Sequence, residues 1–127
     1  LAPLALPDLD RSIVGRLVSH LEDPEEFALP YPVPSVSRRE PSFMPGNARG
    51  FIWRGPSWIN SNWLIGEGLR AHGYGDLVAR LVDRTCDLIV QSGFREYYHP
   101  YTAEGYGSRD HSWSTLVVDM IDGPVRA

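Results

Sequence analysis

The side chains best suited to chemistry begin in residues 51–63, which read FIWRGPSWINSNW and hold three of the four tryptophans of the chain. Sugars have polar rims and apolar faces, so proteins commonly hold them between flat aromatic rings and planar hydrogen-bonding groups. The residues that could do this are Trp53, Arg54, Trp58 and Asn60. Gly55 would let the backbone approach a ligand closely. The alternative is that Trp58 and Trp63 are core residues of a helix.

A second stretch, GFREYYHP at 93–100, places the carboxylate of Glu96 beside two tyrosines and a histidine. Glycoside hydrolysis uses a carboxylate either as a base that deprotonates water or as an acid that protonates the leaving oxygen. A structural ion pair of Glu96 with Arg95 or Arg54 would give the same sequence pattern. Both roles therefore stay open from the residues alone.

Other reactive side chains form weaker patterns. His99, Asp110 and His111 lack the compact spacing of known zinc sites. Asp110, His111 and Ser112 are adjacent in sequence, and such neighbours seldom converge as a catalytic triad. The single cysteine, Cys86, falls in a helical apolar pattern, which favours packing over a nucleophilic role. We expect neither a metal nor a cofactor.

Helical patterns surround these two stretches. Asp8 or Asp10 can cap a helix that continues to about Leu21, and Asp23 begins another short turn or helix. Ser57 and Asp76 are predicted to cap the next two helices. Gly73 and Gly93 are expected to end these two helices, and a last helix is expected over 112–122.

Two long segments separate the predicted helices. Residues 29–50 are rich in proline and serine, and residues 94–111 contain Pro100, Gly105 and Gly107. Both are predicted as loops, because proline removes the amide hydrogen that helices and central strands need. Four main helices without convincing alternating strands predict an all-α fold. Helical hairpins joined by long aromatic loops suit a toroid whose loops build a cleft at one end.

The composition limits the possible partners. The chain has 127 residues, a formal net charge of −4 and no lysine, which argues against a nucleic acid or an anionic membrane as partner. No apolar run approaches the roughly 18 residues needed to span a bilayer. We expect a soluble protein, and the single cysteine fits a cytoplasmic location.

The motifs resemble a known family. The sequence WRGPSWINSNW at 53–63, then EYYHPYT at 96–102, a glycine-rich turn and SWS at 112–114 closely resemble the C-terminal half of the catalytic domain in glycoside hydrolase family 63. Its bacterial mannosylglycerate and glucosylglycerate hydrolase branch is the nearer match. With the segments upstream of residue 51, the resemblance spans nearly the whole chain.

The resemblance implies roles for particular residues. Glu96 matches the general base that activates water in an inverting mechanism. The residues that match the sugar subsite are Trp53, Gly55 and Trp58, together with Arg54 as the motif arginine. His111 lies where relatives carry a polar residue near the ligand, but DHSW here departs from the family pattern xFSW.

The resemblance also implies an incomplete enzyme. Residues 1–127 would be the C-terminal portion of an (α/α)6 barrel, and the start at Leu1 instead of methionine fits a fragment. The family's general acid is an aspartate in the earlier half of the barrel, so the partners would be that half and a small sugar substrate. The isolated chain would be inactive.

The expected reaction is hydrolysis of a small α-glycoside such as glucosylglycerate or mannosylglycerate. The alternatives are a trehalase-like or α-glucosidase specificity, a carbohydrate-binding helical module without catalysis, and a helical interaction domain whose tryptophans belong only to its core. Glu96 and the loop tryptophan Trp53 separate the sugar-related functions from the last of these.

Overall fold

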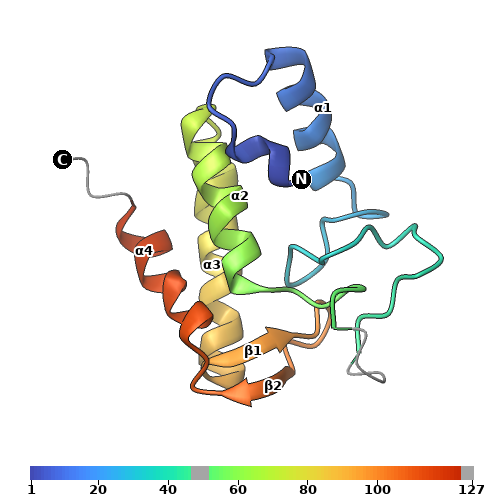
Figure 1. Cartoon of the computed structure of the whole chain (residues 1–127), viewed down its shortest axis with the longest axis vertical. Coiled ribbons are helices and arrows are strands. Elements are labelled where there is room, and N and C mark those ends of the chain that lie inside the picture. The colour runs from blue at the N-terminus through green and yellow to red at the C-terminus, as the bar shows by residue number, and fades with distance from the viewer. Residues whose placement is uncertain (47–51, 124–127) are drawn as a thin grey trace.

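The computed structural model describes residues 1–46 and 52–123. Its elements, in chain order, are η1 (Ala2–Ala5), α1 (Arg11–Leu21), α2 (Ile59–Ala71), α3 (Gly75–Ser92), β1 (Arg95–Tyr98), β2 (Gly105–Arg109), η2 (Ser112–Thr115) and α4 (Leu116–Asp122). Figure 1 shows α2 and α3 side by side along the long axis, with α1 on one side and α4 on the other. The β1–β2 hairpin lies at one end of this pair.

Helix α1 begins as the sequence predicts. The Asp10 side chain caps it by accepting a hydrogen bond of 2.8 Å from the Ser12 amide. Because this acceptor satisfies an amide that has no partner inside the helix, it stabilises the first turn. The helix ends at Leu21, also as predicted, and a turn follows from Asp23.

The α2–α3 helical hairpin is confirmed, but both of its predicted N-caps are wrong. The capping positions are Trp58 and Tyr74, and neither helix has a side-chain cap. The Ser57 hydroxyl is used elsewhere, because it donates to the Tyr31 carbonyl over 2.7 Å. The predicted ends are confirmed, since α2 stops two residues before Gly73 and Gly93 is the C-cap of α3.

The loop predicted over 94–111 is wrong over half of its length. Strands β1 and β2 form an antiparallel hairpin in which Tyr97 pairs with Tyr106 and Tyr98 with Gly105. Tyr97 and Tyr98 are adjacent and both are buried. The strand therefore lacks the alternation of apolar and polar residues by which a half-exposed strand is recognised. The regular structure of the described residues is mainly helical with this one hairpin, so the all-α prediction needs this correction.

The core lies between α2, α3 and the elements that pack on them. Its fully buried aliphatic side chains include Leu4, Ile59, Leu69 and Leu88. Buried Asn62 ties the preceding loop to this core, because its Oδ1 accepts from the Val33 amide and its Nδ2 donates to the Pro32 carbonyl, each over 2.9 Å. The predicted loop over 29–50 is irregular through residue 46 apart from a bridge at Pro34, and residues 47–51 lie outside the described part.

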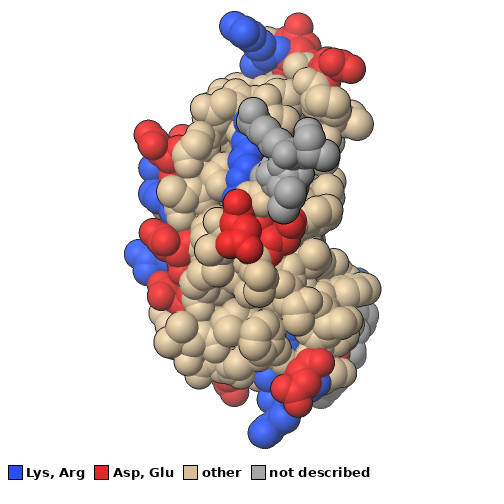
Figure 2. All heavy atoms as spheres, turned by 90° about the vertical axis from the view of Figure 1, so that its left-hand side faces the viewer, with Lys and Arg blue, Asp and Glu red and all other residues tan. Residues whose placement is uncertain are grey.

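Charged side chains are spread over the surface. On the face shown in Figure 2, acidic and basic groups are interspersed and the arginines form no continuous patch. None of the helices in the described part of the chain combines the length and apolar character required to cross a membrane.

Candidate active site

Ser57 joins the two stretches that the sequence singles out. Its amide donates to the Tyr98 carbonyl and its carbonyl accepts from the Tyr98 amide, both over 2.9 Å. Ser57 is fully buried and also pairs with Pro34 as an isolated bridge. Segment 52–58, strand β1 and the proline-rich loop therefore meet at one residue beside the start of α2.

Aromatic rings from both stretches pack at this junction. We call Trp53, Trp58, Tyr97, Tyr106 and Trp113 the aromatic cluster. The Trp53 and Trp58 rings are stacked with centroids 3.8 Å apart, and the Trp58 and Tyr97 rings stack at 5.0 Å. Tyr106 lies 5.9 Å from Tyr97, and Trp113 lies 6.1 Å from Trp58. The other three contacts have the centroid separations that aromatic pairs prefer, whereas the nearly parallel rings of Trp53 and Trp58 lie closer together.

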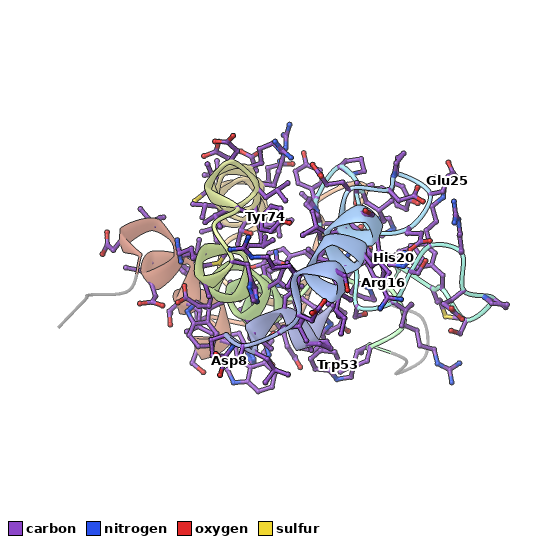
Figure 3. All side chains as sticks on the ribbon, turned by 90° about the horizontal axis from the view of Figure 1, so that it is seen from above. Asp8, Arg16, His20, Glu25, Trp53 and Tyr74 are labelled. Atoms are coloured by element: carbon purple, nitrogen blue, oxygen red, sulfur yellow. The ribbon has the colours of Figure 1, made fainter. Side chains whose placement is uncertain are left out.

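The two tryptophans of the 52–58 segment have different environments. Trp58 is 1% exposed and its Nε1 donates to the Ile52 carbonyl over 3.0 Å, so it is a core residue of this end of the molecule. Trp53 is 47% exposed, and Figure 3 shows it at the edge of the molecule. Trp53 can therefore offer a ring face to a sugar in this structure, whereas Trp58 supports that ring from behind.

Trp113 is a member of the cluster that sequence reasoning missed as a site residue. It comes from η2, is 46% exposed and lies against Trp58. The available signal was that it is the fourth tryptophan of the chain and lies within the SWS motif at 112–114. Its contact with a segment more than fifty residues earlier could not be read from that motif.

Glu96 lies on β1 beside the aromatic cluster. Its side chain is partly buried, and its Oε2 accepts hydrogen bonds from the Ser108 amide at 3.0 Å and the Ser108 hydroxyl at 3.2 Å. Burial raises the pKa of the neighbouring Tyr97 phenol, and the negative charge of Glu96 adds to that increase. The carboxylate is therefore close to the ring that stacks on Trp58.

The alternative of a structural ion pair between Glu96 and Arg95 is not supported. Within residues 1–46 and 52–123, no ion pair joins these two side chains. Arg95 instead donates from Nη2 to the Gly107 carbonyl over 3.1 Å. Arg54 is exposed, and its carbonyl accepts a hydrogen bond from the Met44 amide.

Gly55 is required by packing inside the chain. It is buried with a φ of +139°, a backbone conformation that favours glycine. A β-carbon there would lie 3.0 Å from backbone atoms of both Met44 and Pro45. Its amide donates to the Ser35 hydroxyl over 2.9 Å. The close approach that Gly55 permits is therefore with the 43–45 segment, and its predicted role toward a ligand stays a prediction.

His111 lies next to the exposed tryptophan of η2. Its ring meets the Trp113 ring edge-on with centroids 5.4 Å apart, and its amide donates to the Phe94 carbonyl over 3.2 Å. The Nε2 atom is buried and has no hydrogen-bond partner within the described residues. Buried polar atoms are usually paired, so this nitrogen is an exception among the buried polar atoms of the described residues.

A hollow of about 250 Å³ borders Trp53, but Glu96 does not line it. Its walls come from the N-terminus, the proline-rich loop and α2, and include Leu1, Pro34, Ser61 and Leu64. In the described residues this hollow is therefore not a cleft shared by Trp53 and Glu96. Over the described ranges, no cluster of three or more His, Cys, Asp or Glu side chains could hold a metal ion.

Comparison with known proteins relates the chain to glycoside hydrolases. The chain matches the model of the mannosylglycerate hydrolase MGH1-like glycoside hydrolase domain over residues 1–114. It is 46% identical over 87 residues to mannosylglycerate hydrolase from Thermus thermophilus, an alignment that covers 68% of this chain and 20% of that protein. It is 30% identical over 86 residues to glucosylglycerate hydrolase from Mycolicibacterium hassiacum, which covers 68% of this chain and 18% of that protein.

A solved structure agrees over most of the chain. The crystal structure of a family 63 mannosylglycerate hydrolase from Thermus thermophilus in complex with glucose matches with a TM-score of 0.83 and 37% identity. The match covers 94% of this chain and 29% of that protein. This chain thus spans about a fifth of the length of the curated relatives and less than a third of the solved structure. By its motifs, its structure and the matching model, the chain belongs to the mannosylglycerate hydrolase MGH1-like glycoside hydrolase domain family.

Proposed function

We propose that this chain is the C-terminal portion of an (α/α)6-barrel catalytic domain that hydrolyses a small α-glycoside such as mannosylglycerate or glucosylglycerate. The observation that carries the proposal is Glu96, a carboxylate that Ser108 holds beside an aromatic cluster with two half-exposed tryptophans. The names of the relatives support the choice of substrate.

In this mechanism Glu96 is the general base. Both Ser108 hydrogen bonds go to Oε2, and no described residue donates to Oε1. Oε1 can therefore accept a proton from a water molecule while the water oxygen attacks the anomeric carbon. The bond from that carbon to the leaving oxygen breaks, and the product has the inverted configuration.

The leaving oxygen must receive a proton from a second carboxyl group. Inverting glycosidases place their two carboxyl groups roughly 6.5–9.5 Å apart, with room for the water between them. We assign this acid to the part of the domain outside the present chain, which also completes the cleft around Trp53, Arg54 and His111. In that cleft Trp53 stacks on the sugar, and His111 contributes a polar side chain near the substrate. Trp58 and Gly55 keep this wall in place from inside the protein.

The test is Glu96→Gln in the full-length protein, because it keeps the side-chain shape and removes the proton acceptor. General-base catalysis contributes typically ~10²–10⁴-fold, so kcat should fall by at least that order while KM changes little. Glu104→Gln is the matched control on the same hairpin, where Glu104 accepts from the Tyr106 hydroxyl over 2.9 Å. Its kcat should stay within about tenfold of the wild type.

A second readout distinguishes loss of the base from general damage. In a Glu96→Ala variant, azide can occupy the position of the water and attack the anomeric carbon, giving a glycosyl azide of inverted configuration. Near-normal kcat in Glu96→Gln would refute the base assignment. This chain would then contribute sugar binding and no catalytic group, as in the carbohydrate-binding alternative.

A further inference from the structure

Glu96 faces an irregularity in the hairpin. Between the pairs Arg95–Arg109 and Tyr97–Tyr106, strand β1 has one residue, Glu96, whereas β2 has two, Gly107 and Ser108. Two residues opposite one define a β-bulge, and a glycine with positive φ at its first position is one of its common forms. Gly107 has a φ of +67°. Bulges are frequent next to active sites, where they re-aim a side chain.

The bulge directs two donors at a single carboxylate oxygen. The extra residue turns the amide and the hydroxyl of Ser108 toward Glu96, and both donate to Oε2. In a regular antiparallel pair the residue opposite Glu96 would use its amide in the ladder or point it outward. Hydrogen bonds to a charged group are stronger than those between neutral groups, so this pair of donors restrains the carboxylate.

Gly107 leaves the space that the carboxylate occupies. A β-carbon at this position would overlap with Glu96 Oε2 and lie 2.7 Å from the Glu96 β-carbon and 2.9 Å from Cε1 of Tyr97. Real β-carbons do not approach other atoms this closely, so any larger residue would displace the Glu96 side chain or the Tyr97 ring. Gly107 is thus required both by its backbone conformation and by the position of Glu96.

We propose that Gly107 and Ser108 are positioning residues that fix the Glu96 carboxylate, holding Oε2 with two donors and leaving Oε1 to accept the proton from water. This inference rests on the proposed function of Glu96 as the general base. Neither residue touches the substrate in this assignment. Their effect on turnover comes only through the geometry of Glu96, and small misplacements of a catalytic group cost large factors in rate.

The experiment measures kcat and KM of the full-length protein with mannosylglycerate and glucosylglycerate. Ser108→Ala removes the hydroxyl donor and keeps the amide, so kcat should fall about tenfold with KM unchanged. Ser108→Thr keeps a hydroxyl at this exposed position and should restore most of the rate. Combined with Glu96→Gln, Ser108→Ala should cause no further loss, because residues that act as a unit are not additive.

Gly107→Ala gives the larger expected effect, a fall in kcat of about 100-fold. Its matched control is Gly73→Ala, since Gly73 also has a positive φ of +84° but no atom would lie within 4 Å of its new β-carbon. Both variants should lose thermal stability through the same backbone strain. Only Gly107→Ala should lose turnover.

The outcomes separate this inference from the function on which it rests. If Glu96→Gln loses turnover while Ser108→Ala and Gly107→Ala keep the wild-type kcat, the positioning role is wrong and the base assignment stands. The positioning role is also wrong if Ser108→Ala lowers kcat by the same factor with and without Glu96→Gln. If Glu96→Gln itself keeps a normal kcat, the proposed function fails first.

Discussion

The α2–α3 pair and the aromatic cluster at its end are stabilised in different ways. The helical pair buries aliphatic side chains such as Leu69, Leu81 and Leu88 along its length. The cluster instead stacks large rings and is fastened by backbone hydrogen bonds at Ser57 and by the polar contact of Glu96 with Ser108. The first region depends on non-directional burial, and the second depends on hydrogen-bond geometry.

This difference fits the roles that the proposed function gives to the two regions. A helical core tolerates conservative apolar exchanges as long as its volume is kept. A catalytic carboxylate needs a position defined to a fraction of an ångström, which directional contacts supply. In the proposed function, the helical pair is the rigid support, and the hairpin with segment 52–58 carries the functional groups. The substitutions below test this division.

The largest stability effect is expected for Trp58→Ala in the full-length protein. Trp58 is 1% exposed and stacks with both Trp53 and Tyr97, so truncation should lower the free energy of unfolding by about 3–5 kcal/mol. Trp53→Ala is the matched control. At 47% exposure it should cost about 1 kcal/mol or less but raise KM for the sugar substrate. Equal losses of stability in urea denaturation would contradict the different roles of the two rings.

Leu88→Ala tests the helical pair. Leu88 is fully buried on α3, and the cavity left by truncation should lower the free energy of unfolding by about 2–5 kcal/mol. The kcat measured at a temperature where the variant is folded should stay near the wild-type value. Val90→Ala on the same helix, where Val90 is 84% exposed, should change stability by about 0.5 kcal/mol or less. A larger loss there would mean that the rest of the protein covers this face of α3.

Thr85→Val tests the polar link between α2 and α3 inside the helical pair. The Thr85 hydroxyl accepts from Asn62 Nδ2 over 3.0 Å and donates to the Leu81 carbonyl over 2.7 Å, all inside the core. Valine keeps the shape but leaves a buried amide hydrogen unpaired, which should cost about 1–3 kcal/mol in thermal or urea unfolding. Thr115→Val, at an exposed position of η2, is the control and should be close to neutral.

The smallest effect concerns pH. Burial lowers the pKa of His99 below its ordinary value of 6.5, against an opposing effect of Glu104. The unfolded chain therefore binds a proton at higher pH than the folded chain, and stability decreases as pH falls below about 6.5. His99→Gln should remove this contribution. Relative to the wild type, the Tm of the variant should rise as the pH is lowered from about 7.5 to about 5. A difference in Tm that does not change with pH would contradict the assignment.

Local patterns in the sequence determined the helical frame. The cap at Asp10, the glycines that end α2 and α3, and the apolar periodicity of both helices depend on residues within a few positions of one another. The stretch 51–63 was recognisable by its composition, and the roles given to Glu96, Trp53, Arg54, Gly55, Trp58 and His111 came mainly from the family motifs. These roles stay predictions until the variants are measured.

Only the tertiary structure decided which of these residues are exposed and what holds them. Trp53 and Trp58 look equivalent in sequence. The Trp58 ring is nevertheless buried, because Tyr97 of β1 packs against it, whereas the Trp53 ring is half-exposed. The hairpin escaped prediction because Tyr97 and Tyr98 are both buried, each by partners far along the chain. The contact of Ser108 with Glu96 depends on a bulge, which is defined by the pairing of two strands and not by either strand alone. Short-range patterns therefore predict helices, whereas long-range contacts select the conformation of the candidate site.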